Sequence, residues 1–275
     1  MKNILKMNIA LFTSNHLRHK YIATEIAKTL SLKLIICEEK SKIIQQTETY
    51  NDEDRFLLEN HFQNRKDSEE QFFGEFQDFP SDVVRTYVAH GTINSLNTLE
   101  LLKEYKIDCI LLFGTSIIKP IIIQEFPNKV INLHLGLSPY YKGSGTNFFP
   151  IVNNEFECIG ATIHLATDAV DAGAILHQFR PDSIQEDDDI HQLGNKVIQK
   201  AGEIYPKIVN FFLLKKIKPC TQIQSEESKV YRIKDFNVSA LEIANATMIN
   251  GGVKNYLKHK NQRLAAKPIV SNYNE

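Results

Sequence analysis

Three polar residues at a defined spacing are the candidates for chemistry in this chain. Asn132 and His134 lie two residues apart in the apolar run from Val130 to Leu135, and on a β-strand such a pair leaves by the same face. Asp171 follows in a later turn, Val-Asp-Ala-Gly. A carboxylate beside an imidazole fixes its tautomer and stabilises its protonated form, which suits proton transfer. These residues predict an active site.

At these residues the chain resembles the folate-dependent formyltransferases. The shared pattern is Asn-x-His, then a loop with proline and glycine that runs here from Pro139 to Gly145, then Asp-x-Gly. The resemblance extends from about Met7 to about Lys215. It implies formyl transfer from 10-formyltetrahydrofolate to a primary amine, with His134 as general acid and base. It further implies that an N–H of Asn132 stabilises the oxyanion and that Asp171 orients the imidazole.

The resemblance also implies where the two substrates bind. The pterin ring is expected against the backbone at the end of an apolar strand, and the cofactor residues are Leu112, Phe113, Gly114, Thr115 and Asp168. Positions in nearby loops make further residues candidates for the acceptor: Arg18, His19, Asn94, Tyr140, Lys142, Gly143 and Asn147. Solvated or packing roles remain open for each of these acceptor candidates.

Two departures from the family pattern bear on the acceptor. Family members usually carry Ser-Leu-Leu-Pro where this chain has Gly136-Leu137-Ser138-Pro139, so a serine contact is absent or displaced. Members that act on a purine precursor have a glycine-rich phosphate loop after the first strand, whereas residues 13–19 contain no glycine. The purine acceptor is therefore disfavoured.

Charge composition argues against a nucleic-acid acceptor. The chain has 275 residues, 32 of them basic and 33 acidic, with a sequence pI near 6.8. Such a balance gives no electrostatic footprint for tRNA. By the resemblance, the remaining large acceptor class of this family is an amino sugar on a TDP or UDP carrier, and similar chains serve surface-polysaccharide pathways.

Other functions stay open as alternatives. They are glycinamide ribonucleotide formylation, methionyl-tRNA formylation and a non-catalytic folate-binding module. An intact set of Asn, His and Asp argues against the binding module. A nucleotide-dependent oxidoreductase would require Gly-x-Gly-x-x-Gly after the first strand, which residues 13–19 lack.

Cysteine spacing and hydropathy bound the environment. Four cysteines lie far apart with no paired spacing, so neither a zinc site nor a disulfide framework is expected. No apolar run reaches the 18 residues typical of a membrane span, and Met1 to Met7 is too short for a signal peptide. We expect a cytoplasmic protein with neither metal nor membrane partner.

Hydrophobic periodicity predicts an α/β fold with a Rossmann-like, mostly parallel sheet flanked by helices. The expected strands are 8–14, 32–37, 83–89, 107–113, 130–135, 161–166 and 174–179, the last two forming a hairpin around Asp171. Helices are expected over 22–30, 97–105 and 190–208. Acids at 187–189 are expected at the start of the last helix, and Pro206 is the position where a kink is expected. His164 and His177 are interpreted as satisfied or solvated strand residues.

For two further segments the sequence predicts structure but no part in the chemistry. Residues 38–77 predict a charged surface insertion of one or two helices, which either covers a substrate or packs. After the catalytic domain, residues 1–214, a small C-terminal α+β subdomain is expected over 215–275. It should hold strands at 221–223 and 229–233 and a helix opened by a capping box at Ser239. We expect this subdomain to serve docking or homodimer formation.

Overall fold

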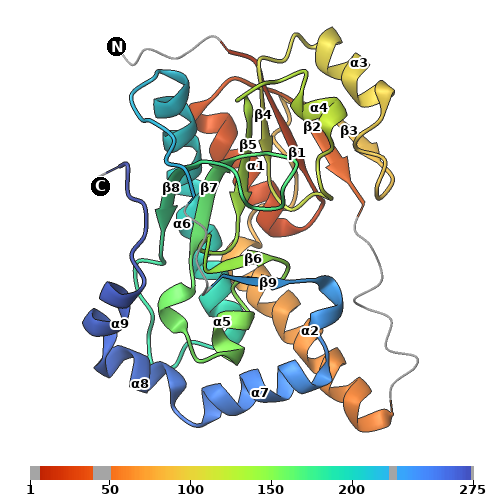
Figure 1. Ribbon diagram of the computed structural model, residues 1–275. Coiled ribbons are helices and arrows are strands. Elements are labelled where there is room, and N and C mark those ends of the chain that lie inside the picture. The colour runs from red at the N-terminus through yellow and green to blue at the C-terminus, as the bar shows by residue number, and fades with distance from the viewer. Residues whose placement is uncertain (1–6, 40–50, 223–227, 274–275) are drawn as a thin grey trace.

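A seven-stranded sheet forms the centre of the molecule, in a computed structural model that describes residues 7–39, 51–222 and 228–273. The strand order is β3-β2-β1-β4-β5-β7-β8 (Figure 1). The first five strands in this order are parallel to one another. Strand β7 runs antiparallel to both of its neighbours, β5 and β8. Their bounds are β1 Ile9–Thr13, β2 Leu32–Glu38, β3 Val84–Val88, β4 Cys109–Leu112, β5 Val130–His134, β7 Ala161–Leu165 and β8 Ile175–Phe179. The predicted fold class and the hairpin around Asp171 are confirmed.

Helices cover both faces of the sheet because alternate strand residues point to opposite sides. Ile9 and Leu11 pack with α1 (Leu17–Thr29) and α6 (Ile190–Leu213) on one face. Ala10 and Phe12 pack with α3 (Leu96–Glu104) and α4 (Pro120–Ile123) on the other. The central strands are thus buried on both sides, and the carboxyl-terminal edge of the sheet remains for a site.

The charged insertion folds as one long helix, α2 (Asp52–Phe73), over its described part. Asn51 caps this helix by accepting from the Asp54 N–H. The helix packs against α1 and α6, where Asn195 donates to the Ser68 hydroxyl at 3.0 Å. Residues 40–50 of the predicted insertion lie outside the described residues.

Of the three acids expected at the start of the long helix, only Asp189 caps it, and the first turn contains no acid. Asp189 accepts from the N–H groups of His191 and Gln192, and Gln192 completes a capping box. The helix continues through Pro206 to Leu213.

The C-terminal segment differs from the predicted strand pair. Strand β9 (Lys229–Tyr231) pairs with β6 (Tyr141–Gly143), in the loop that follows β5, in parallel, rather than with residues 221–223. Of that predicted strand, residues 221 and 222 are not in a strand and residue 223 lies outside the described residues. The preceding Cys220 forms an isolated bridge to Ile175. The following helix begins earlier than expected, because Asn237 rather than Ser239 is its cap.

Short helices complete the fold around this strand pair. They are α5 (Phe149–Val152), α7 (Val238–Ile249), α8 (Gly252–Lys258) and α9 (Lys260–Ala266), with 3-10 turns at Phe156–Cys158 and Ile233–Asp235. Helix α7 contacts both α5 and α2, and it runs along the lower side of the molecule in Figure 1. The chain after residue 228 is therefore built onto the catalytic part.

The structure shows how the cysteines are buried and whether any described helix could span a membrane. Cys37, Cys109 and Cys158 are buried free thiols, and Cys220 is exposed. In the described part of the chain, no helix combines the length and the apolarity needed to span a bilayer.

Candidate active site

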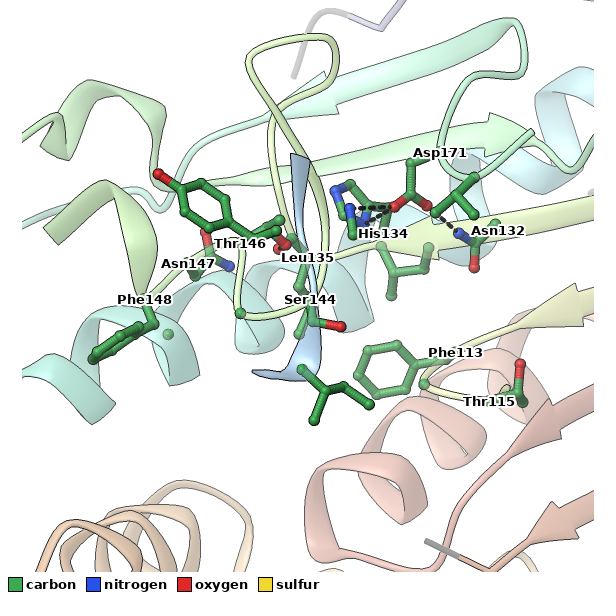
Figure 2. Close-up of a pocket in the computed structure, with 18 of the residues that line it drawn as sticks. Phe113, Thr115, Asn132, His134, Leu135, Ser144, Thr146, Asn147, Phe148 and Asp171 are labelled. Atoms are coloured by element: carbon green, nitrogen blue, oxygen red, sulfur yellow. Dashed lines mark hydrogen bonds and ion pairs between the residues drawn. The ribbon is translucent and has the colours of Figure 1, made fainter. Parts of the chain in front are cut away.

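Asn132 and His134 stand on β5 at the carboxyl-terminal edge of the sheet (Figure 2). The His134 side chain is 6% exposed. Its Nδ1 lies 3.2 Å from Asp171 Oδ2, and its Nε2 lies 3.0 Å from the carbonyl oxygen of Tyr141. Both ring nitrogens face oxygen atoms, an arrangement that an imidazolium, with two N–H donors, satisfies in full.

The turn that carries Asp171 is built to bring its carboxylate to the site. Asp171 adopts φ 49°, in the left-handed region that aspartate tolerates. Gly143 donates its backbone N–H to Asp171 Oδ2 at 2.9 Å, and Gln222 donates to the Asp171 carbonyl at 2.9 Å. A side chain at Gly173 would meet the Leu165 carbonyl at 1.7 Å, so the turn requires glycine there.

Burial and charge act in opposite directions on this pair. Burial alone would raise the pKa of Asp171, but His134, His164 and the Gly143 N–H together lower it to about 2. Burial lowers the pKa of His134, and Asp171 opposes that shift. The carboxylate is thus charged at neutral pH and stabilises a proton on the imidazole.

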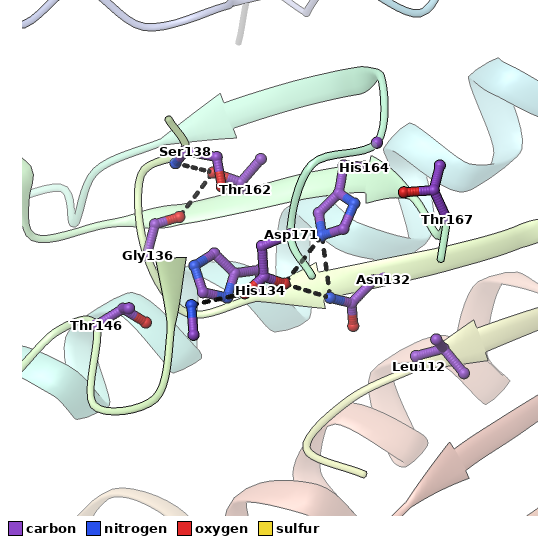
Figure 3. A network of polar contacts seen from close by, with 12 residues as sticks. Leu112, Asn132, His134, Gly136, Ser138, Thr146, Thr162, His164, Thr167 and Asp171 are labelled. Atoms are coloured by element: carbon purple, nitrogen blue, oxygen red, sulfur yellow. Dashed lines mark hydrogen bonds and ion pairs between the residues drawn. The ribbon is translucent and has the colours of Figure 1, made fainter. Parts of the chain in front are cut away.

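His164 joins the predicted set, contrary to its interpretation as a residue without a functional partner. It lies opposite Asn132 in the antiparallel β5–β7 register (Figure 3). Its Nε2 is 3.0 Å from Asn132 Nδ2 and 3.4 Å from Asp171 Oδ1, while its Nδ1 contacts the Leu165 carbonyl at 2.8 Å. The Leu165 carbonyl assigns a proton to Nδ1, and Nε2 faces both the Asn132 amide and the Asp171 carboxylate.

The amide of Asn132 is held on two sides. Its Nδ2 lies 3.3 Å from Asp171 Oδ1 in addition to its contact with His164. To donate an N–H to an oxyanion, the Asn132 amide has to break its contact with either His164 or Asp171. The predicted oxyanion role of Asn132 stays a prediction.

A cavity of about 1070 Å³ opens in front of these side chains. The predicted cofactor residues Leu112, Phe113, Gly114 and Thr115 line it, as do Asn132, His134 and Asp171. In Figure 2, Phe113 and Thr115 lie below Asn132 on the same side of the view. Asp168 is exposed and is absent from the lining residues.

His19 supports the expected cofactor segment from below. It is 1% exposed, its Nδ1 lies 2.8 Å from the Thr13 hydroxyl, and its ring packs 4.7 Å from that of Phe113. A Cβ on Gly114 would come within 2.5 Å of the His19 ring. These contacts give His19 a packing role, and since it also lines the cavity, the expected acceptor contact stays a prediction.

Glu38, which the sequence did not single out, holds Ser116 in the loop that follows β4. Its carboxylate is 2% exposed and accepts from the Ser116 N–H at 2.7 Å, the Ser116 hydroxyl at 2.8 Å and the Gly91 N–H at 2.9 Å. The end of β2 therefore ties together the loops that follow β3 and β4.

The departure at Gly136 has a steric reason. A Cβ there would lie 2.6 Å from His134 Nε2 and 2.6 Å from Thr146 Cβ. Thr146 lines the cavity and donates its hydroxyl to the Leu135 carbonyl. Threonine from the following loop thus fills the space that a serine at position 136 would need.

The remaining acceptor candidates divide into two groups. Arg18, Gly143 and Asn147 line the cavity. Asn94, Tyr140 and Lys142 do not line it. Asn94 instead binds the backbone at residues 117 and 119, and the Tyr140 hydroxyl donates to the Pro268 carbonyl.

Residues on and after β9 also line the cavity, which the sequence did not indicate. Val230, Tyr231 and Phe236 belong to this wall. Tyr231 stacks on Phe149 with ring centroids 3.7 Å apart. The described residues contain no group of three or more potential metal ligands.

Comparison with known proteins agrees with this geometry. A family model described as formyl transferase matches residues 7–209. Phosphoribosylglycinamide formyltransferase of Haemophilus influenzae is 31% identical over 127 residues, covering 43% of this chain and 59% of that protein. Methionyl-tRNA formyltransferase of Ehrlichia ruminantium is 25% identical over 154 residues, covering 56% and 50%. The alignments therefore span little more than half of these relatives.

A similar fold appears in a solved sugar N-formyltransferase from Shewanella sp FDAARGOS_354. The TM-score is 0.56 at 16% identity, with 88% of this chain and 87% of that chain covered. At this identity the likeness concerns the fold. The family model spans most of the chain and includes Asn132, His134 and Asp171, so the chain belongs to the formyltransferase family.

Proposed function

We propose that this protein transfers a formyl group from 10-formyltetrahydrofolate to the primary amine of a nucleotide-linked amino sugar. The observation that carries the proposal is the joined set of Asn132, His134 and Asp171 facing one cavity. A volume of about 1070 Å³ suits two ligands that meet. The cosubstrate would lie against Leu112 to Thr115, with no metal required.

The reaction forms one C–N bond and breaks another. The acceptor nitrogen attacks the formyl carbon on N10, and the tetrahedral intermediate carries negative charge on the former carbonyl oxygen. The C–N10 bond then breaks, and the proton lost by the amine replaces the formyl group on N10. Asn132 would donate an N–H to the oxygen, where such a donor stabilises developing charge by about 3 to 4 kcal/mol.

His134 would carry the proton between the two nitrogens. Asp171, charged at neutral pH, stabilises the imidazolium during the transfer. For direct transfer, Nε2 has to leave the Tyr141 carbonyl, to which it lies at 3.0 Å.

Features of this chain support the acceptor class. The names of its relatives include a purine-pathway enzyme and a tRNA-modifying enzyme. Against these two acceptors stand the absence of glycine in residues 13–19 and the near-neutral charge. The cavity also extends to α2 and to residues after β9, which gives room for a long acceptor.

Glycinamide ribonucleotide is the second candidate acceptor. The 31% identity to the Haemophilus influenzae enzyme over 127 residues favours it.

A direct assay separates these acceptors. Tetrahydrofolate release from 10-formyltetrahydrofolate would be followed with TDP-linked 3-amino and 4-amino sugars, UDP-linked 4-amino sugars, glycinamide ribonucleotide and methionyl-tRNA. We expect turnover with one amino sugar and its loss in His134→Ala. Turnover only with glycinamide ribonucleotide or tRNA would overturn the acceptor class, and folate binding without any turnover would favour the binding module.

A further inference from the structure

Helix α2 forms a cavity wall that the proposed chemistry leaves without a role. His61, Arg65 and Glu69 recur at every fourth residue of this helix, which places them along one face. His61 and Arg65 line the cavity. Glu69 accepts from the Arg18 N–H at 3.1 Å and forms an ion pair with the Arg18 guanidinium. The face therefore runs from the start of α1 to His61.

The His61 end of this face belongs to an aromatic cluster made of His61, Phe148, His191 and Phe236. The His61 ring lies 6.0 Å from Phe148, 4.5 Å from His191 and 5.3 Å from Phe236. All four line the cavity and remain half-buried. Burial lowers the pKa of His61 to about 3 and of His191 to about 4, so both rings are neutral at neutral pH. Such faces suit the stacking of a flat ring.

The other end of the face carries positive charge. Arg65 is exposed and makes no hydrogen bond or ion pair with any residue in the described parts of the chain, although the Glu69 carboxylate favours its charged form. Arg18 beside it lowers the pKa of Arg65 to about 10, which leaves the guanidinium charged at neutral pH. Two guanidinium groups and the Glu69 carboxylate give this wall one net positive charge. A guanidinium that is accessible and makes no ion pair with a described residue is well suited to a phosphate group.

We propose that α2 seats the nucleotide of the acceptor, with the base on the aromatic cluster and the diphosphate on Arg65 and Arg18. This inference rests on the proposed function, since it names the carrier end of the same acceptor. Figure 2 shows Phe148 and Thr115 at opposite sides of the view, with His134 between them. A nucleotide at the Phe148 side would leave its amino sugar near His134, and the Thr115 side would remain for the folate.

The test is titration calorimetry of the full chain with TDP, UDP and inorganic diphosphate. Arg65→Gln should weaken all three roughly tenfold or more, because charged hydrogen bonds to phosphate are lost. Phe236→Leu should weaken TDP and UDP roughly fivefold and leave inorganic diphosphate unchanged. Arg55→Gln is the matched control, since Arg55 lies on the same helix beside Asp52 and does not line the cavity. Thermal melting checks that each variant folds.

Three outcomes would overturn the seat. One is equal nucleotide affinity in Arg65→Gln and Arg55→Gln, and another is loss of inorganic diphosphate binding in Phe236→Leu. The third is weakened tetrahydrofolate binding in Arg65→Gln with TDP and UDP unchanged, which would assign the wall to the folate tail. If any of these results occurs while the protein still turns over an amino sugar, the nucleotide site on α2 is wrong and the proposed function is still supported. Turnover only with glycinamide ribonucleotide would instead remove the proposed function.

Discussion

The Nε2 atom of His164 lies 3.0 Å from the amide nitrogen of Asn132, directly across the β5–β7 pair. A second histidine therefore holds the residue that is expected to stabilise the oxyanion. Because the His164 Nδ1 contacts the Leu165 carbonyl, the ring is held in one tautomer. The aligned side chains of an antiparallel pair thus set the orientation of the amide that we propose stabilises the oxyanion.

Replacement of His164 should affect the chemical step more than binding. We expect His164→Leu to lower kcat about tenfold, since a buried hydrogen bond worth about 1.4 kcal/mol is lost, with both KM values little changed. His164→Gln keeps an acceptor and should recover part of the loss. Steady-state kinetics of the two variants measure this difference.

His177 offers a matched control for His164. It is a buried histidine on the adjacent strand β8 and accepts from the Asn272 N–H at 3.2 Å. His177→Leu should leave kcat unchanged in protein that remains folded. A similar fall in kcat in both variants would show that His164 acts only through packing.

Asp171→Asn should shift the pH profile as well as the rate. Asp171 is charged throughout the working range, since its pKa is lowered to about 2, and it raises the pKa of His134. Removing the charge lowers the pKa of His134, so the acidic limb of kcat/KM should move to lower pH. The rate should fall on the order of 100-fold, as expected when a proton carrier loses its support. An unshifted acidic limb would separate Asp171 from the titration of His134.

The sequence predicted the parts of the site that depend on local patterns. Alternation along one strand placed Asn132 and His134 on the same face, and turn residues placed Asp171 after the hairpin strand. His164 lies on a strand as regular as any other, and only the register of β7 on β5 reveals its partner. Glu38 likewise acts on two distant loops, which no local pattern connects.

The C-terminal segment shows a second limit of sequence patterns. Strand β9 has three residues, too few for a clear alternation, and it pairs with the loop that follows β5 at Gly143. That pairing requires glycine, because a Cβ at Gly143 would meet the Tyr231 carbonyl at 2.1 Å. The domain boundary at residue 214 stays a prediction, although residues beyond it line the cavity.

Asn132→Ala should reduce turnover with little effect on acceptor binding. Loss of one donor to the tetrahedral intermediate costs about 3 kcal/mol, so kcat should fall roughly 100-fold or more. The measurement is kcat for the acceptor found in the panel, with the acceptor KM as the internal reference. Normal turnover in this variant would remove the oxyanion role of Asn132.

Glu38→Gln should weaken cosubstrate binding without changing the proton transfer. Glutamine keeps one oxygen, so the Ser116 and Gly91 donors lose part of their shared acceptor and the loop after β4 loosens. We expect the folate KM to rise about tenfold, from about 1.4 kcal/mol of lost hydrogen bonding, with the pH profile unchanged. Glu39→Gln, an exposed neighbour, is the control and should leave the folate KM unaltered. A rise in the acceptor KM alone would contradict the role assigned to Glu38.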